Sequence, residues 1–155
     1  MTARAATKQD ADWIAKLLVQ RCGSTTIIAH GEAFDLLTLP ALVADPERGL
    51  ATYRLEGNDA ELMSLDAVSP GQGVGTLLIE ALADVLREQG IGCLWVMTTN
   101  DNLAALRFYQ QRGFELRRVR PGAVHEARLL KPAIPDIGDH GIPIRDEIDL
   151  CRPLL

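Results

Sequence analysis

Apolar residues recur at helical spacing in two parts of the chain. Between residues 76 and 89 they fall every three or four positions, which predicts a helix with one apolar face, and Gly90 is placed to end it. Residues 13–18 show the same spacing after a capping-box sequence at residues 7–10. A second helix is therefore expected there, and Gly23 is placed to end it.

Two apolar runs flank a turn sequence in the middle of the chain. Leu50–Leu55 and Glu61–Val68 enclose Gly57-Asn58-Asp59, a combination typical of a β-hairpin. Ile91–Met97 is a continuous apolar run, as expected of a strand that is buried on both faces. We therefore expect three strands in this region, with the helix over 76–89 between the second and the third.

The remaining segments continue the alternation of strands and helices. The expected elements are an edge strand at 2–6, a helix at 102–112, a strand at 114–119, a short helix at 123–130 and a strand at 144–151. Residues 24–46 mix β-branched and apolar positions without a clean period, so no element is assigned to them. The alternation over 61–119 indicates a partly parallel sheet flanked by helices. Because no linker divides the chain, residues 1–155 are expected to form a single domain.

The composition is that of an ordinary globular chain. The 155 residues carry a formal net charge of −5, which argues against non-specific binding to nucleic acid. Arg117, Arg118 and Arg120 lie close together, and we expect them on a solvated strand end. No nucleic-acid partner is therefore expected.

The cysteines and the apolar runs exclude two further classes. The three cysteines are far apart and show no spacing typical of zinc ligands, so no metal is expected. Neither a leader-like segment nor an apolar run of membrane-spanning length is visible. We therefore expect a cytoplasmic protein without a membrane partner.

A glycine-rich turn is the most informative local feature. Gly71-Gln72-Gly73-Val74-Gly75-Thr76 follows an apolar strand and opens the helix over 76–89. Such a turn bares backbone N–H groups at a helix N-terminus, which favours a phosphate. A dinucleotide-binding turn would have glycine in place of Thr76, and a P-loop would need Gly-Lys-Ser/Thr, which does not occur. A tight connection without a ligand remains the plain alternative.

A second motif follows one strand later, as Asn102-x-x-Ala105-x-x-Phe108-Tyr109-x-x-x-Gly113-Phe114. Together the two motifs resemble those of the GNAT (Gcn5-related N-acetyltransferase) superfamily. The resemblance implies an α/β (α+β) fold whose central mixed, mostly antiparallel sheet is flanked by helices. Its fourth and fifth strands, here Glu61–Val68 and Gly92–Thr98, would splay apart to admit acetyl-CoA.

The resemblance also implies which residues contact the cofactor. The turn would hold the pyrophosphate, the end of the fourth strand would pair with the pantetheine arm, and a residue after the fifth strand would lie nearby. These residues are Ala67, Val68, Gln72, Gly73, Val74, Gly75, Thr76 and Asn102. One position departs from the family, because Pro70 stands where an Arg or Gln usually precedes the glycines.

Catalytic roles follow from the same resemblance. Tyr109 matches the usual general acid, and the backbone N–H of Val68 is the expected oxyanion donor. Asp66, at the end of the fourth strand, is the first candidate for the general base. Glu32 and His30, in the segment where the family places its acceptor-binding helix, and a chain of waters remain alternatives.

The resemblance points to an N-acetyltransferase that moves an acetyl group from acetyl-CoA to the amine of a small molecule or peptide. A non-catalytic acyl-CoA-binding or sensing module on the same fold is the main alternative, and a dinucleotide-dependent oxidoreductase is a weaker one. We expect Glu32–Leu39 and Pro121–Pro143 to form the wall of the acceptor site, with His125, Glu126, Asp136, Asp139 and His140 as polar groups. A surface flap or a homodimer contact is the other use of the later segment.

Overall fold

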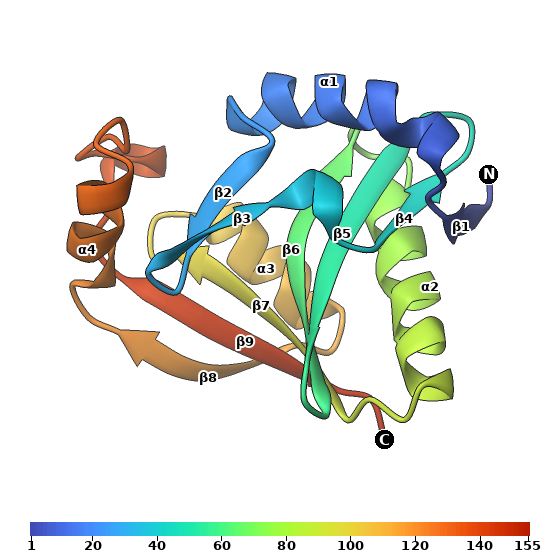
Figure 1. The fold of residues 1–155 in the computed structure, drawn as a ribbon. Helices are drawn as coiled ribbons and strands as arrows, with labels where there is room; N and C mark the ends of the chain where they lie inside the picture. Colours follow the sequence, from blue (N-terminus) through green and yellow to red (C-terminus); the bar gives the residue numbers. More distant parts are fainter. The chain divides into compact units, whose positions relative to one another are not determined.

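The computed structural model describes residues 1–155, which form two compact units (Figure 1). The first unit comprises Met1–Ile27, Asp35–Leu94 and Leu154–Leu155, and the second comprises Ile28–Phe34 and Trp95–Pro153. The expectation of a single domain over the whole chain stays a prediction.

Four antiparallel strands form the sheet of the first unit. Their order is β1 (Ala3–Ala5), β4 (Ala41–Ala44), β5 (Gly49–Glu56) and β6 (Asp59–Ala67). The turn between β5 and β6 has Gly57 at a φ of +60°, so the hairpin predicted around this glycine is confirmed. The predicted edge strand is β1, at one end of this sheet.

Two helices cover opposite faces of these strands (Figure 1). Helix α1 (Ala11–Cys22) follows the short η1 (Lys8–Asp10), and its buried leucines pack on Val43 and Leu50. Helix α2 (Val74–Glu88) approaches the neighbouring position Gly49 instead. Because adjacent strand residues point to opposite faces, α1 and α2 lie on the two sides of the sheet. Both helices confirm predicted elements.

A buried carboxylate fixes the entry to α1. Asp10 is only 5% exposed and accepts two hydrogen bonds of 2.8 Å from Arg4 and one of 3.1 Å from Trp13. The Arg4 guanidinium and the Thr7 N–H hold the pKa of this carboxyl well below its usual range. The capping box predicted for residues 7–10 is present. Through its bonds to Arg4, Asp10 therefore also ties β1 to the start of α1.

Helix α2 lies unusually close to β5 at Gly49. A Cβ on this residue would collide with the side chain of Val74 and lie 2.9 Å from the backbone oxygen of Asp66. Val74 is the first residue of α2, and Asp66 lies near the end of β6. The missing side chain therefore lets the first turn of α2 sit directly against the ends of β5 and β6.

The second unit contains three strands and two helices. Strand β9 (Glu147–Pro153) lies between β7 (Cys93–Thr99, of which Trp95 onward belongs to this unit) and β8 (Glu115–Arg120). Helix α3 (Leu103–Gln111) connects β7 to β8, and α4 (Ala123–Leu130) follows β8. A short η3 (Asp139–Gly141) precedes β9. The predicted helices at 102–112 and 123–130 and the strands around them are confirmed.

The segment left unassigned by its sequence pattern forms a hairpin, a single 3-10 turn and strand β4. Strands β2 (Thr26–Ala29) and β3 (Glu32–Asp35) precede η2 (Leu36–Thr38). His30 and Gly31 connect the strands with φ values of +53° and +77°, as in the two-residue turns that match strand twist. No helix forms around His30 and Glu32, where the family places its acceptor-binding helix, because this left-handed pair reverses the chain too tightly for one.

The expected fold class is confirmed, since mostly antiparallel strands are flanked by helices in a mixed α/β arrangement. The splay between the strands at 61–68 and 92–98 stays a prediction.

We expect Gly49→Ala to lower the free energy of unfolding by about 1–3 kcal/mol, since the added methyl group overpacks a site closed by backbone atoms. Chemical denaturation of the purified protein measures this change. Gly92→Ala is the matched control, because its new Cβ would have no neighbour closer than 3.8 Å. Equal stabilities of the two variants would contradict the close approach.

Candidate functional site

The glycine-rich turn has the geometry of an anion-binding site. Gly71 and Gly73 have φ values of +78° and +76°, so the chain turns sharply before α2. The first bond of the helix runs from Leu77 N–H to the Gly73 oxygen at 3.0 Å. The N–H groups of residues 73–75 therefore precede the helical ladder and point out of its positive end. The turn can accept a phosphate through its backbone.

A cation lies beside this turn that the sequence pattern did not reveal. Arg48 donates to the side chain of Gln72 at 3.3 Å, and both residues are exposed. Pro70 stands where the family usually has an Arg or Gln before the glycines. Arg48, in the connection between β4 and β5, supplies a guanidinium beside the turn instead. The sequence does not signal this position, because a β-bulge between Thr52 and Tyr53 shifts the pairing that sets Arg48 beside Val68.

The backbone at the end of β6 differs from the prediction for Val68. The N–H of Val68 donates to the carbonyl of Arg48 at 2.9 Å, so it is engaged in the sheet and does not face a substrate. In an antiparallel ladder the N–H groups of successive residues point to alternate sides. The N–H of Ala67 therefore points away from β5. The prediction that the Val68 N–H donates to an oxyanion is therefore wrong, because its ladder partner decides its direction.

Arg21, at the C-terminal end of α1, contacts the same strand end. Its guanidinium donates to the carbonyl oxygens of Ala67 and Val68, each at 3.0 Å. No sequence pattern marks this residue, because nothing in a helical arginine indicates contact with a strand 46 residues away.

Asp66 is the most perturbed carboxylate near this strand end. It lies opposite Leu50 in the ladder, so its side chain points to the face that α1 covers. One carboxylate oxygen, Oδ2, is buried without a hydrogen-bond partner. Burial raises the pKa of Asp66, and the nearby positive charge of Arg21 opposes this rise only in part. The group is thus a carboxyl with an unused acceptor atom.

The second unit holds the other two predicted site residues. Asn102 is the N-cap of α3, where its side chain accepts from the N–H of Ala105 at 3.0 Å. Tyr109 is 9% exposed, and its ring meets Phe108 and Phe114 edge-on at centroid distances of 5.3 and 5.2 Å. The helix and the two phenylalanines therefore fix the position of the Tyr109 ring.

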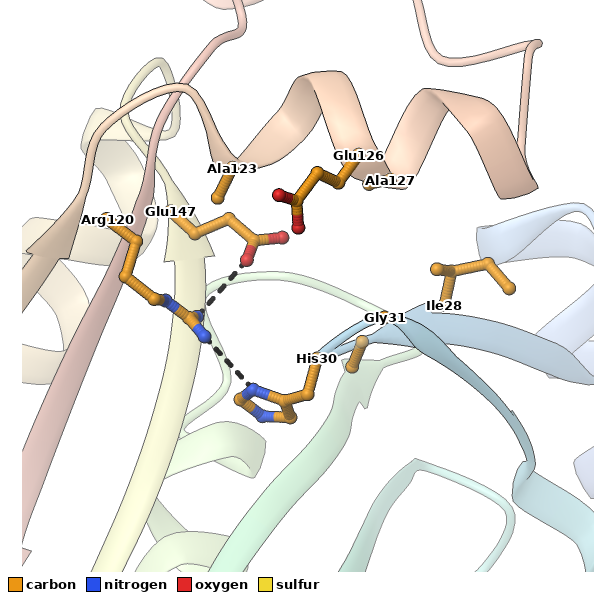
Figure 2. A pocket seen from close by; sticks show the side chains of 9 residues that line it. Ile28, His30, Gly31, Arg120, Ala123, Glu126, Ala127 and Glu147 are labelled. Carbon is orange, nitrogen blue, oxygen red and sulfur yellow. Dashed lines mark hydrogen bonds and ion pairs between the residues drawn. The ribbon is translucent and has the colours of Figure 1, made fainter.

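A cavity of about 230 Å³ lies within the second unit (Figure 2). It opens between the β2–β3 turn and α4, and its polar groups are His30, Arg120, Glu126 and Glu147. Of the acidic groups expected to form the acceptor wall, Glu126 lines this cavity. Asp136 and Asp139 do not, and Asp139 instead donates its N–H to the buried Asp101 at 3.1 Å. Residues 32–39 do not line it either.

Arg120 lies in a network of ion pairs and does not form the solvated strand end that was expected. Its guanidinium lies 2.9 Å from Asp149 and 3.2 Å from Glu147, and it contacts His30 Nδ1 at 3.1 Å. The side chain is only 27% exposed, and its Nε is buried without a partner. Arg118 also pairs with Asp149, at 3.0 Å, although most of its side chain is exposed. The acidic partners on β9 lie too far along the chain for sequence spacing to reveal them.

None of the helices combines the length and the apolar character needed to cross a bilayer. No group of three or more His, Cys, Asp or Glu side chains is arranged to hold a metal ion.

Comparison with known proteins identifies the family. A family model described as "Acetyltransferase (GNAT) family" matches residues 49–114, which include the glycine-rich turn and Tyr109. The chain is 46% identical over 106 residues to the uncharacterized protein YxbD of Bacillus subtilis (strain 168), which covers 68% of this chain and 67% of that protein. The chain belongs to the GNAT acetyltransferase family.

Further relatives extend this result. Streptothricin acetyltransferase of Streptomyces lavendulae is 36% identical over 91 residues, or 56% of this GNAT chain and 48% of that protein. The chain thus spans about half the length of that relative. A Bacillus subtilis acetyltransferase solved in complex with CoA shares the fold, with a TM-score of 0.73, 17% identity and 99% of each chain covered. The family predicted from the two motifs is confirmed.

We expect Asp66→Asn to change how stability depends on pH. The raised pKa of Asp66 means that the folded protein holds this proton more tightly than the unfolded chain. The resulting stability is present at acidic pH and is lost as the pH rises through the raised pKa, whereas asparagine stays neutral. The free energy of unfolding of the variant should therefore gain on that of the wild type as the pH rises from the ordinary aspartate pKa, near 4, through the raised pKa of Asp66.

Denaturation curves at several pH values measure this difference. Glu88→Gln, which changes an exposed carboxylate on α2, is the control and should show little pH-dependent change. A constant difference between Asp66→Asn and wild type would show that the Asp66 pKa is not raised.

Proposed function

We propose that this protein is an N-acetyltransferase that moves an acetyl group from acetyl-CoA to the amine of a small molecule or peptide. The observation that carries the proposal is the bare helix N-terminus of α2, which lies against the end of β6 because Gly49 has no side chain. Family membership supports acetyl transfer as the chemistry.

The glycine-rich turn, the end of β6 and the start of α3 supply the proposed contacts with the cofactor. The N–H groups of Gly73, Val74, Gly75 and Thr76 hold the pyrophosphate, with Gln72 and Arg48 beside them. The backbone of Ala67 and Val68 pairs with the pantetheine arm, and Asn102 lies near the cofactor. A carbonyl oxygen accepts two hydrogen bonds, so Arg21 and a cofactor amide can share the Ala67 oxygen.

Acetyl transfer requires three groups in defined roles. The amine nitrogen forms a bond to the thioester carbon, and the C–S bond breaks to release a thiolate. Asp66 accepts the amine proton, for which its unpartnered Oδ2 and raised pKa fit. The N–H of Ala67 stabilises the oxyanion, in place of the engaged Val68. Tyr109 protonates the thiolate, since a tyrosine hydroxyl, with an ordinary pKa near 10, holds its proton at neutral pH and can donate it as the C–S bond breaks.

The alternative is a module that binds acyl-CoA without turnover. Steady-state consumption of acetyl-CoA with a panel of amines distinguishes the two functions. Acetyl-CoA binding without consumption in the presence of any amine would favour the module.

We expect Gly75→Asp to abolish CoA binding, because it places a negative charge beside the proposed pyrophosphate site. Aspartate in the first turn of a helix is favourable to folding, so the variant should stay folded. Gly75→Ala adds bulk without charge and should weaken binding less. Calorimetric titration with CoA tests both, and unchanged affinity in folded Gly75→Asp would remove the pyrophosphate from this turn.

We expect Tyr109→Phe to lower kcat on the order of 10²-fold with little change in CoA affinity, because the ring and its packing are kept while the acidic proton is lost. Turnover measured where chemistry limits the rate provides the test. Tyr53→Phe, which removes the other tyrosine hydroxyl of the chain, is the control. Equal turnover of the Tyr109 variant and the wild type would assign the thiolate proton to another donor.

A further inference from the structure

The cavity of the second unit combines a polar side with an apolar side. Figure 2 shows Glu126 reaching down from α4 toward Glu147, while Arg120 and His30 lie below them. Ile28, Ala123 and Ala127 form the apolar part of the lining. At about 230 Å³ the cavity is smaller than the roughly 300–1,000 Å³ sites of drug-sized ligands. It suits one end of a small molecule or a single long side chain.

The carboxylate of Glu147 is buried and only half satisfied. Its side chain is 10% exposed, and Oε1 pairs with Arg120 at 3.2 Å. The other oxygen points into the cavity toward Glu126 (Figure 2). This oxygen has no ion-pair partner and lines the cavity, so it is available to a donor with a positive charge.

The positive charge already present is shared among more carboxylates than it can match. Arg120 pairs with both Glu147 and Asp149, and Arg118 also pairs with Asp149. Glu126 forms no ion pair, so the two carboxylates of the lining, Glu126 and Glu147, face the single guanidinium group of Arg120. The cavity therefore carries one negative charge in excess and attracts a cation.

We propose that this cavity binds a cationic nitrogen of the acetyl acceptor, on a short aliphatic stem, between Glu126 and Glu147. The proposal rests on the proposed acetyltransferase function. The carboxylates bind the charged group, while Ile28, Ala123 and Ala127 contact the stem. The bound nitrogen has a defined chemical state, because neighbouring carboxylates favour the protonated form of an amine.

A protonated nitrogen has no lone pair to attack a thioester. The nitrogen held in this cavity is therefore not the one that is acetylated, and the acceptor carries at least two cationic nitrogens. Diamines and molecules with a basic side chain beside a reactive amine belong to this class. The cavity then acts as a specificity site that recognises one end of the acceptor by its charge.

Calorimetric titration without CoA tests the binding site directly. The probe is 1,4-diaminobutane, and 1,4-butanediol is its uncharged match. We expect the diamine alone to bind, with at least tenfold weaker affinity in Glu147→Gln and clearly weaker affinity in Glu126→Gln. Glu126 is exposed, so its variant stays informative if Glu147→Gln fails to fold. Glu115→Gln, outside the cavity, is the control and should bind as the wild type does.

Acetylation kinetics then test the role of the site. We expect kcat/KM for 1,4-diaminobutane to exceed that for butylamine at least tenfold in the wild type, and the Glu126 and Glu147 variants to lose this preference through a higher KM. A lysine-containing tripeptide, run in parallel, shows whether a peptide supplies the second cation better than a free diamine.

The two proposals fail in different ways. Acetylation of an amine by a protein that does not bind the diamine, or binds it equally in both variants, overturns the cation site and leaves the acetyltransferase function intact. Diamine binding that depends on Glu126 and Glu147 but occurs without acetylation of any amine overturns the function and, with it, the acceptor role of the cavity.

Discussion

The absence of a side chain at Gly49 is the constraint on which the first unit depends. A methyl group there would meet Val74 and the backbone of Asp66, so α2 could not begin where it does. The helix start, the glycine turn before it and the end of β6 are held together by this one close approach. Backbone groups of an anion site gain most when they are placed in advance, because no ordering cost remains when the ligand arrives.

The same strand end shows how tertiary contacts tune a site. Arg21 reaches two carbonyl oxygens of β6 from the opposite face of the sheet, and its charge also acts on Asp66. Burial and this charge act on the carboxyl in opposite directions, and burial dominates. The pKa of this carboxyl is thus held above that of an exposed aspartate, which makes it a stronger base.

In the second unit the charges are arranged around a void. Arg118 and Arg120 of β8 form ion pairs with the acidic residues of β9. Helix α4 adds Glu126, which forms no ion pair. The β2–β3 turn closes the other side with His30 in a left-handed conformation that costs a non-glycine residue free energy. Such strain is retained where surrounding contacts hold the residue in place. Here the hydrogen bond between the Arg120 guanidinium and His30 Nδ1 is such a contact.

The sequence alone determined the features that depend on local pattern. The apolar period of α2, the hairpin around Gly57 and the capping box before α1 were readable because neighbouring residues decide them. The two spaced motifs likewise identified the family. The tertiary structure decided what distant residues share: the Val68 N–H is taken by Arg48, and His30 meets Arg120 across 90 residues of chain. Spacing along a chain carries no record of such contacts, because strand pairing and side-chain packing set them only when the chain folds.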